Sequence, residues 1–131
     1  MSVTDAAEVY LQYNSAENAH DLDLLESLVA PGLVVEVNGR VGVSSADEDR
    51  EAMRRLFETY PDYRRSIEDV LEAGDRVTVR WRMLGTPAAA GAAALDVPGC
   101  SVVTAREGQL AEAYLYYDGE ALDRILAGIG D

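Results

Sequence analysis

The spacing of apolar residues changes at Tyr63, and this change constrains the fold more than any other feature of the chain. Before Tyr63, apolar side chains recur about every three or four residues, the period of an α-helix with one buried face. After Tyr63 they alternate with polar ones, most regularly at Val77, Val79, Trp81 and Met83, which is the period of a β-strand. Helices gathered first and strands gathered after them predict an α+β domain.

The predicted order of elements is two helices, a strand, a helix, four strands and a last helix. Thr4 can cap the first helix, Asp21 begins the second, and Pro31-Gly32 closes it. We expect helices at residues 4–19, 21–30, 47–59 and 118–131. We expect strands at residues 33–38, 97–106 and 109–118, and two more within 63–85. A curved antiparallel sheet folded over the N-terminal helices would form a cone with an open end, which is a natural small-molecule pocket.

The strand that follows Tyr63 is expected to keep its alternation throughout. Its odd-numbered positions, which run from Arg65 through Ile67 to Leu71, should then share one face. Asp62, which follows Pro61, is expected to fix the turn into this strand by a side-chain hydrogen bond.

Length and charge limit the classes of function. The chain has 131 residues, which predicts a single domain over 1–131 with a sizeable core. The formal net charge is −13, so we expect no binding to nucleic acid or to anionic membrane surfaces. The first residues contain early acids and no long apolar run, so we expect neither a signal peptide nor a membrane span, and a cytoplasmic location.

The reactive side chains are few. The basic residues are all Arg, which excludes a Schiff-base or lysine-base mechanism. Cys100 is the single cysteine and His20 the single histidine, so neither an intrachain disulfide nor a zinc cluster of known spacing is expected. We therefore expect no metal and no cofactor.

Several short motifs stand in an order that resembles one family. They are NAHDLDLLESLVAPGLVVEV near the start, Pro61-Asp62, Gly74-Asp75-Arg76-Val77, Arg80-Trp81 and Gly85-Thr86 in the middle, and EGQLAEAYLYYD near the end. Together they resemble SnoaL-type polyketide cyclases of the nuclear-transport-factor-2-like superfamily, over nearly the whole chain. The resemblance implies a cone-shaped, cystatin-like roll, a pocket for a hydrophobic small molecule, and a homodimer formed through the sheet.

The resemblance also implies a catalytic acid. In SnoaL-type cyclases an Asp at the end of the last strand is the general acid/base for an intramolecular aldol closure, and Asp118 occupies that place. Such chemistry needs a carboxylate in an apolar pocket, where desolvation raises its pKa, and Tyr114 and Tyr116 are candidates for the pocket wall. Asp118 directly precedes GEALDRIL, however, so it is also a candidate helix N-cap.

One departure from the family pattern weakens the transfer of that reaction. The family's Gly-Thr-His becomes Gly85-Thr86-Pro87, and no histidine follows His20. A pocket histidine that could assist Asp118 is therefore missing.

Ketosteroid isomerases of the same superfamily provide a second comparison. Tyr13 stands where their helix-one tyrosine would, and it is a candidate hydrogen-bond donor to a carbonyl oxygen. The position of their general base falls at Val37 or Asn38, and no Asp stands near Cys100 to Val103. An isomerase of that type is disfavoured, although Tyr13 or Asn38 could orient a carbonyl. The alternative is that Tyr13 is a core aromatic residue.

Limonene-epoxide-hydrolase-like members use an Asp-Arg-Asp constellation, which the RWR sequence at residues 80–82 does not reproduce. Arg80 could still pair with Asp118 or with a ligand carboxylate, or it could belong to a solvated strand face. Trp81, on the opposite face, belongs either to the pocket lining or to a dimer interface. Phe57 is expected to face inward with Met53.

Two classes of function follow. The first is a cofactor-free cyclase or isomerase for a polyketide- or terpenoid-like molecule, in which Asp118 moves a proton. In it, Tyr13 or Asn38 orients a carbonyl, and the substrate contacts are supplied by Phe57, Arg80, Trp81, Tyr114 and Tyr116. The second is a non-catalytic binding or dimerisation module of the same fold, with an epoxide-hydrolase-like enzyme as a further alternative.

Overall fold

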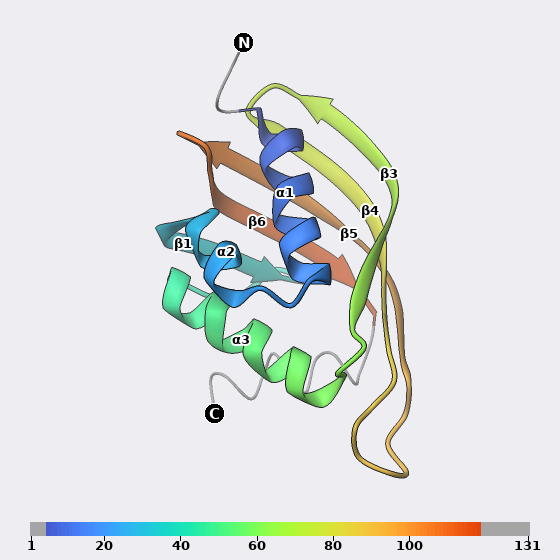
Figure 1. Ribbon diagram of the computed structural model, residues 1–131. Helices are drawn as coiled ribbons and strands as arrows, with labels where there is room; N and C mark the ends of the chain where they lie inside the picture. The colour runs from blue at the N-terminus through green and yellow to red at the C-terminus, as the bar shows by residue number, and fades with distance from the viewer. Residues whose placement is uncertain (1–4, 119–131) are drawn as a thin grey trace.

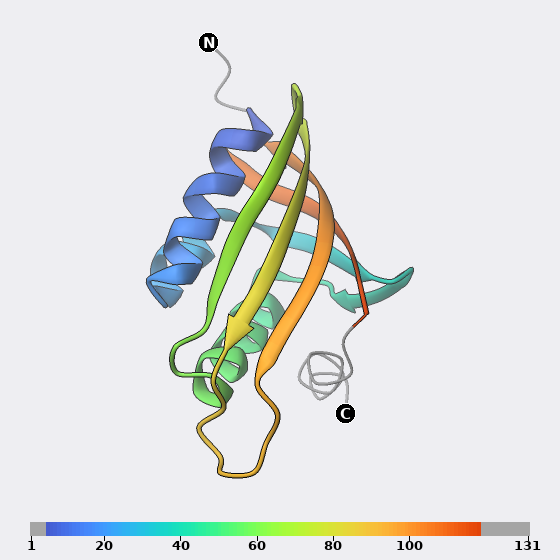
Figure 2. The same cartoon turned by 90° about the vertical axis from the view of Figure 1, so that its right-hand side faces the viewer.

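The structure is a computed structural model that describes residues 5–118. Three helices lie on the concave face of a curved six-stranded sheet (Figures 1 and 2). The elements are α1 Ala6–Asn18, α2 Leu22–Ser27, β1 Val29–Val37, β2 Arg40–Val43, α3 Ala46–Thr59, β3 Arg64–Ala73, β4 Arg76–Gly85, β5 Leu95–Arg106 and β6 Gln109–Tyr117. The α+β class and the cone-shaped sheet are as the sequence predicted.

The sheet has the strand order β2-β1-β6-β5-β4-β3. β1 pairs with β6 in parallel, and the other neighbours pair antiparallel. The sheet is therefore mixed, which corrects the expected all-antiparallel arrangement. Parallel pairing is possible because the long connection through β2 and α3 to β5 lets β6 return alongside β1 in the same direction.

Strand β2 is not among the elements expected from the sequence. Asn38 and Gly39 both adopt positive φ, 51° and 86°, and form the two-residue turn that joins β1 to β2. The strand expected at residues 33–38 therefore continues through a hairpin turn at Asn38 and Gly39 into a second strand.

The first two helices begin near the predicted residues. Asp5 caps α1, and its carboxylate accepts hydrogen bonds from the backbone N–H groups of Ala7 and Glu8. The predicted cap, Thr4, lies outside the described residues. Asp21 caps α2 as predicted, but this helix ends at Ser27, and β1 already includes Pro31. The proline is tolerated because it lies where the β1–β6 register is irregular.

The alternation of β3 is interrupted by a bulge. Ile67 pairs with Trp81 and Asp69 with Arg80, so one extra residue is inserted in β3 between them. The bulge exchanges the two faces of the strand, and Val70 rather than Leu71 packs on the core. Leu71 is 64% exposed, which corrects the expectation that it shares the face of Arg65.

The motif between Tyr60 and Thr86 has a structural role. The Asp62 carboxylate accepts a 2.6 Å hydrogen bond from the backbone N–H of Thr86, which confirms that Asp62 fixes the turn into β3. Gly85 lies against Tyr60, and a Cβ on this glycine would lie 2.8 Å from the Tyr60 Cβ. The start of β3 and the end of β4 are joined at these two contacts.

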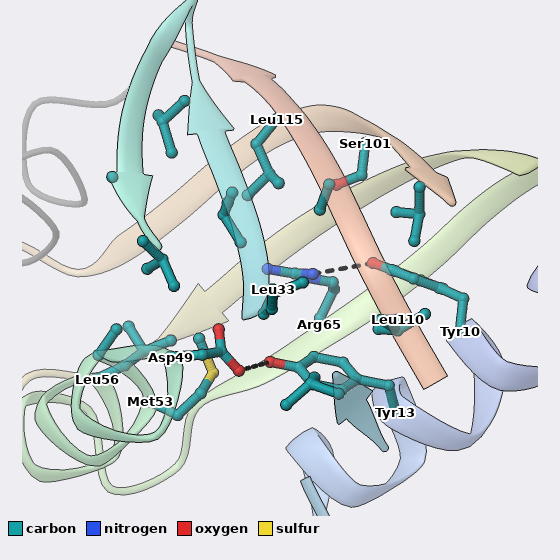
Figure 3. Close-up of a pocket in the computed structure, with 18 of the residues that line it drawn as sticks. Tyr10, Tyr13, Leu33, Asp49, Met53, Leu56, Arg65, Ser101, Leu110 and Leu115 are labelled. Carbon is teal, nitrogen blue, oxygen red and sulfur yellow. Dashed lines mark hydrogen bonds between the residues drawn. The ribbon is translucent and has the colours of Figure 1, made fainter. Parts of the chain in front are cut away.

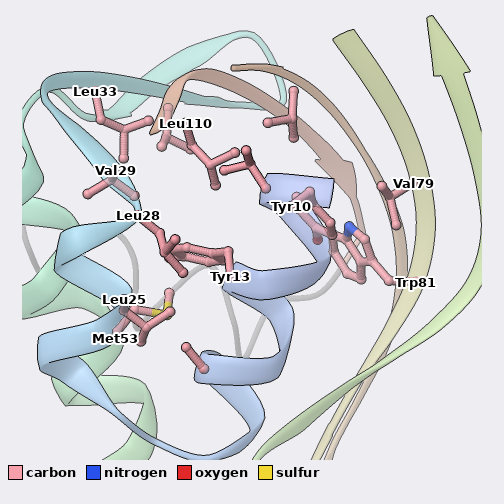
Figure 4. Packing of buried hydrophobic residues seen from close by; sticks show 14 of the residues in the cluster. Tyr10, Tyr13, Leu25, Leu28, Val29, Leu33, Met53, Val79, Trp81 and Leu110 are labelled. Carbon is pink, nitrogen blue, oxygen red and sulfur yellow. The ribbon is translucent and has the colours of Figure 1, made fainter. Parts of the chain in front are cut away.

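The hydrophobic core fills the space between the helices and the sheet (Figure 4). Trp81 is fully buried there, and its indole N–H donates a 2.8 Å hydrogen bond to the Ser101 hydroxyl. Among residues 5–118, no helix has the length and apolarity needed to cross a membrane. The predicted last helix lies outside the described residues.

Candidate functional site

A mainly apolar cavity lies between the concave face of the sheet and helices α1 and α3 (Figure 3). Its apolar lining includes Leu33, Val35, Met53, Leu56, Leu110 and Leu115. The volume of the cavity is about 70 Å³. One water molecule needs roughly 10–15 Å³, so the cavity has room for more than one water. The cavity can hold a small ligand or part of a larger one. The polar groups that line it are Tyr10, Tyr13, Asp49, Arg65 and Ser101.

The first polar group is a carboxylic acid bonded to a phenol. The Tyr13 hydroxyl donates a 2.9 Å hydrogen bond to Oδ2 of Asp49, and both side chains are buried. In Figure 3 the other Asp49 oxygen points away from Tyr13, toward the middle of the cavity. One carboxylate oxygen is thus held by the protein, and the other faces the space a ligand would occupy.

Burial sets the protonation of this pair. Desolvation is the main cause that raises the pKa of Asp49, to about 6, and the charge of Glu17 adds to it. The hydrogen bond from Tyr13 and the charge of Arg65 act in the opposite direction. Burial and the charge of Asp49 hold the pKa of Tyr13 well above its usual value, so Tyr13 stays protonated and keeps donating.

The position of Asp49 follows from the start of α3. Ser45 caps this helix by accepting a 3.1 Å hydrogen bond from the backbone N–H of Glu48, while Glu48 reaches back to the backbone N–H of Ser44. With the helix start fixed, Asp49 falls on the buried stripe of α3, between Ala46 and Met53. Its neighbours on that stripe are apolar, which is why its carboxylate loses most of its hydration.

The second polar group surrounds a buried guanidinium. Arg65 on β3 is 6% exposed, and its Nη1 donates a 2.9 Å hydrogen bond to the Tyr10 hydroxyl. Its Nη2 lies 3.4 Å from Oε2 of Glu17 and 3.5 Å from the sulfur of Met83. The guanidinium also lies over the Trp81 ring, 4.6 Å from its centroid. Nε of Arg65 is buried and makes no hydrogen bond.

The charge of Arg65 is maintained although burial opposes it. Desolvation alone would lower its pKa, but the charge of Glu17 and the oxygens of Tyr10 and Tyr63 outweigh this and raise it well above the usual value. Glu17 is fully buried and also accepts a hydrogen bond from the Tyr63 hydroxyl. The Glu17–Arg65 ion pair therefore lies at the edge of the cavity, with Arg65 on the lining and Glu17 behind it.

Tyr13 is the one predicted site residue that the structure places on the cavity lining. Phe57 lies elsewhere, half-buried, with its ring stacked on His20 at a centroid distance of 4.1 Å. Trp81 faces the core and is not part of the expected pocket lining, because it lies behind it, beneath Arg65 and Ser101. It supports polar groups of the cavity instead of contacting its space.

Asn38 lies at the β1–β2 turn, outside the cavity lining. Its amide Nδ2 donates a 2.9 Å hydrogen bond to the carbonyl oxygen of Tyr117, and its Oδ1 accepts a 3.1 Å bond from the Tyr117 N–H. Both ends of the amide therefore join β1 to β6. The expected orientation of a substrate carbonyl by Asn38 gives way to this structural role.

Three predicted contact residues lie on the outer face of the sheet. The Tyr114 hydroxyl donates to Glu112 at 2.8 Å, Tyr116 is 51% exposed, and Arg80 pairs with Glu68 at 3.0 Å. Side chains of successive strand residues point to opposite faces, so the cavity wall on β6 is formed by Leu110, Ala113 and Leu115 instead of the two tyrosines. Arg80 fits the alternative of a solvated strand face.

Asp118 follows β6 directly, and its side chain is exposed and does not line the cavity. The helix that it was expected to cap lies outside the described residues. Within residues 5–118, the structure brings together no group of three or more His, Cys, Asp or Glu side chains that could hold a metal ion.

Asp49, Arg65 and Glu17 are not among the candidate site residues expected from the sequence. Each was marked by a detectable signal, because each carries a charge at a position where the local period predicts an apolar side chain. Asp49 interrupts the stripe of α3, Glu17 interrupts the stripe that contains Tyr10 and Tyr13, and Arg65 stands on the apolar face of β3.

Comparisons with known structures agree with the fold. A proposed SnoaL-like polyketide cyclase from Jannaschia sp. CCS1 has 21% sequence identity and a TM-score of 0.75, covering 97% of this chain and 96% of that one. AclR from Streptomyces galilaeus, a proposed hydroxylase, has 20% identity and a TM-score of 0.76, covering 99% and 85%. An NTF2-like protein of unknown function from Cytophaga hutchinsonii has 10% identity and a TM-score of 0.71, covering 89% and 93%.

No curated protein sequence matches the chain. The family model of the SnoaL-like domain matches residues 10–113, which include most of α1, the whole of α3 and most of the sheet. Its match spans both hydrogen-bonded pairs around the cavity. The chain therefore belongs to the SnoaL-like domain family of the nuclear-transport-factor-2-like superfamily.

Proposed function

We propose that the protein is a cofactor-free cyclase or isomerase of an apolar small molecule, in which Asp49 accepts and returns a proton. The observation that carries this proposal is a carboxylate with a pKa of about 6, held by Tyr13 and aimed into an apolar cavity. A base whose pKa lies near the working pH is ionised often enough to accept a proton and acidic enough to return it. Positioned acid/base groups of this kind typically contribute about 10²–10⁴-fold to a rate.

The proposed step is a proton transfer between carbon and Asp49. The ionised carboxylate removes a proton from a carbon beside an electron-withdrawing group. In an isomerisation it then gives that proton to another carbon, and in a ring closure it gives it to the oxygen of the attacked carbonyl. Tyr13 stays protonated throughout and keeps the carboxylate in one orientation. The apolar wall limits access of water to the reacting carbon.

Asp118 remains the acid/base residue that the family resemblance implies. It is exposed in the described part of the chain, whereas Asp49 is desolvated, and desolvation is what adjusts a carboxylate for this chemistry. We therefore propose Asp49 for the role and retain Asp118 as the competing assignment. A polyketide- or terpenoid-like substrate, a homodimer and a cytoplasmic location also stay proposals.

The test compares the two carboxylates on one neutral probe. 2-Tetralone is an apolar ketone with activated α-hydrogens, and their exchange for deuterium in D₂O can be followed by NMR. We expect Asp49→Asn to lower the protein-catalysed exchange rate by about a hundredfold or more. Asp118→Asn should leave it unchanged, and circular dichroism should show both variants folded.

Each outcome of this comparison decides between assignments. Full exchange in Asp49→Asn would overturn the role of Asp49, and loss of exchange in Asp118→Asn alone would assign the proton transfer to Asp118. Binding of 2-tetralone by the wild-type protein without any exchange above the buffer rate would favour the binding module. If Asp49 acts as the base, the exchange rate should rise with pH through an apparent pKa of about 6.

A further inference from the structure

The buried guanidinium of Arg65 has a donor that the fold leaves unused. Nη1 donates to Tyr10, and Nη2 contacts Glu17 and Met83, but the Nε–H group has no partner although it is buried. Buried donors in native proteins are nearly always satisfied, and an exception requires an explanation. Oε1 of Glu17 is also buried without a hydrogen bond, but it does not bond to Nε. Because Arg65 lines the cavity, a ligand oxygen seated against the guanidinium is an acceptor that would satisfy this group.

The position of Arg65 is fixed well enough for it to act as a receptor. The side-chain amide of Asn18, at the end of α1, makes two hydrogen bonds to the backbone of Arg65, at 2.7 and 3.1 Å. The stacked Trp81 ring supports the guanidinium from one side. A donor that is held by its neighbours loses little conformational freedom when a ligand binds.

The charges around the cavity decide what kind of oxygen fits. The formal charges of Glu17 and Arg65 cancel, since their side chains lie 3.4 Å apart and both are buried. The net formal charge of Glu17, Arg65 and Asp49 then depends on Asp49 alone. It is zero when Asp49 is protonated and −1 when Asp49 is ionised. An anionic ligand would find no uncompensated positive charge, and the whole chain, at −13, would repel it.

We propose that Arg65, with Nε as the donor, forms a subsite for a neutral oxygen acceptor, and that the substrate is therefore an uncharged molecule carrying a carbonyl or ether oxygen. This inference deepens the proposed function. It rests on that function only in calling the bound molecule a substrate. Asp49 and Arg65 are the two ends of the arrangement: the acid/base group on α3 and the oxygen receptor on β3 (Figure 3).

Binding of three matched probes tests the subsite. Tetralin has the ring system of 2-tetralone without the oxygen, and 1,2,3,4-tetrahydro-2-naphthoate carries a carboxylate instead. Dissociation constants are measured at pH 8 by calorimetry or NMR titration, for the wild-type protein and for variants. We expect the wild type to bind the ketone more tightly than the carboxylate. We also expect the ratio of ketone to tetralin affinities to fall about tenfold when Arg65 is removed, the size of one charge-assisted hydrogen bond.

The variant must not leave a buried charge behind. Arg65→Met alone leaves Glu17 unpaired, so the double variant Glu17→Gln, Arg65→Met is used, with Arg82→Met on the outer face as the matched control. The control should keep the wild-type ratio. An unchanged ratio in the double variant, or tighter binding of the carboxylate than of the ketone by the wild type, would overturn the proposal.

The Arg65 Nε–H group can also be followed directly in the wild-type protein by NMR. Addition of 2-tetralone should shift one protected arginine Nε–H resonance in a ¹⁵N–¹H spectrum, and tetralin should leave that resonance in place. Equal shifts with both probes would also overturn the proposal. The binding measurements test the Arg65 subsite, and the exchange rate tests the acid/base role of Asp49. Either proposal can therefore fail while the other holds.

Discussion

At the scale of single residues, the site depends on charged side chains in apolar positions. Asp49 is nearly fully buried, yet it has one hydrogen-bond donor, Tyr13, and its remaining oxygen faces the cavity. Desolvation therefore disfavours its ionised form, and the pKa is raised to about 6. Such a group lowers the stability of the fold at neutral pH, which is a common cost of a functional site.

The first residue-scale prediction concerns pH and stability. The folded protein binds the Asp49 proton more tightly than the unfolded chain does, since the pKa rises from 3.8 to about 6 on folding. Its stabilising contribution is thus complete below pH 3.8 and is lost as the pH rises through about 6. The free energy of unfolding of Asp49→Asn, relative to wild type, should increase by about 1.5 kcal/mol between pH 5 and pH 8.

Urea unfolding of both proteins at the two pH values measures this change. Taking the difference between variant and wild type cancels the titration of the other acids. The prediction is wrong if that difference is the same at both pH values, or if it decreases.

At the scale of elements, the segment from Tyr60 to Thr86 joins two strands into one wall. The Asp62 carboxylate holds the Thr86 N–H, and Gly85 permits close approach of the Tyr60 side chain. This contact fixes where β3 begins relative to the end of β4. It thereby fixes the strand that carries Arg65, which pairs with Met83 two residues before Gly85.

We expect Gly85→Ala to destabilise the protein by about 1–3 kcal/mol. The added methyl group would lie 2.8 Å from the Tyr60 Cβ, so the end of β4 and the C-terminal end of α3 must move apart. Gly32→Ala is the matched control, because a Cβ on Gly32 meets nothing within 4 Å and its stability should change by less than about 0.5 kcal/mol. Equal midpoints of urea unfolding for the two variants would contradict the close contact.

At the scale of the whole molecule, the cone is completed where the first strand meets the last. β1 and β6 pair in parallel, and the Asn38 amide extends this pairing by bonding both the N–H and the carbonyl of Tyr117. Both strands contribute to the cavity wall, through Val35 on β1 and Leu115 on β6. The cavity therefore exists only when two distant parts of the chain are in register.

Asn38→Asp tests this junction with little change in size. Aspartate tolerates the positive φ of 51° at this position, but it places an oxygen where Nδ2 donates to the Tyr117 carbonyl. We expect a loss of about 1 kcal/mol in the free energy of unfolding and faster amide hydrogen exchange at Tyr117. Unchanged stability together with unchanged exchange would show that the amide contributes nothing to the junction.

The sequence alone determined the fold class and most of the elements, because these depend on local periods, turn residues and motifs. It also predicted a side-chain hydrogen bond of Asp62, but not its partner Thr86, which is 24 residues away along the chain. Through the family resemblance it also identified Tyr13 as a candidate hydrogen-bond donor or core aromatic residue. It did not reveal β2, the parallel pairing of β1 with β6 or the bulge in β3, which depend on hydrogen bonds between strands far apart along the chain.

Tertiary structure alone decided which polar residues meet. Glu17, Asp49 and Arg65 come from α1, α3 and β3. Their burial, and the pKa shifts of Asp49 and Arg65, arise only when these elements pack together. The same packing places Tyr114, Tyr116 and Arg80 on the outer face. The physical reason is that desolvation and charge pairing depend on what surrounds a side chain in space, whereas the sequence fixes only its neighbours along the chain.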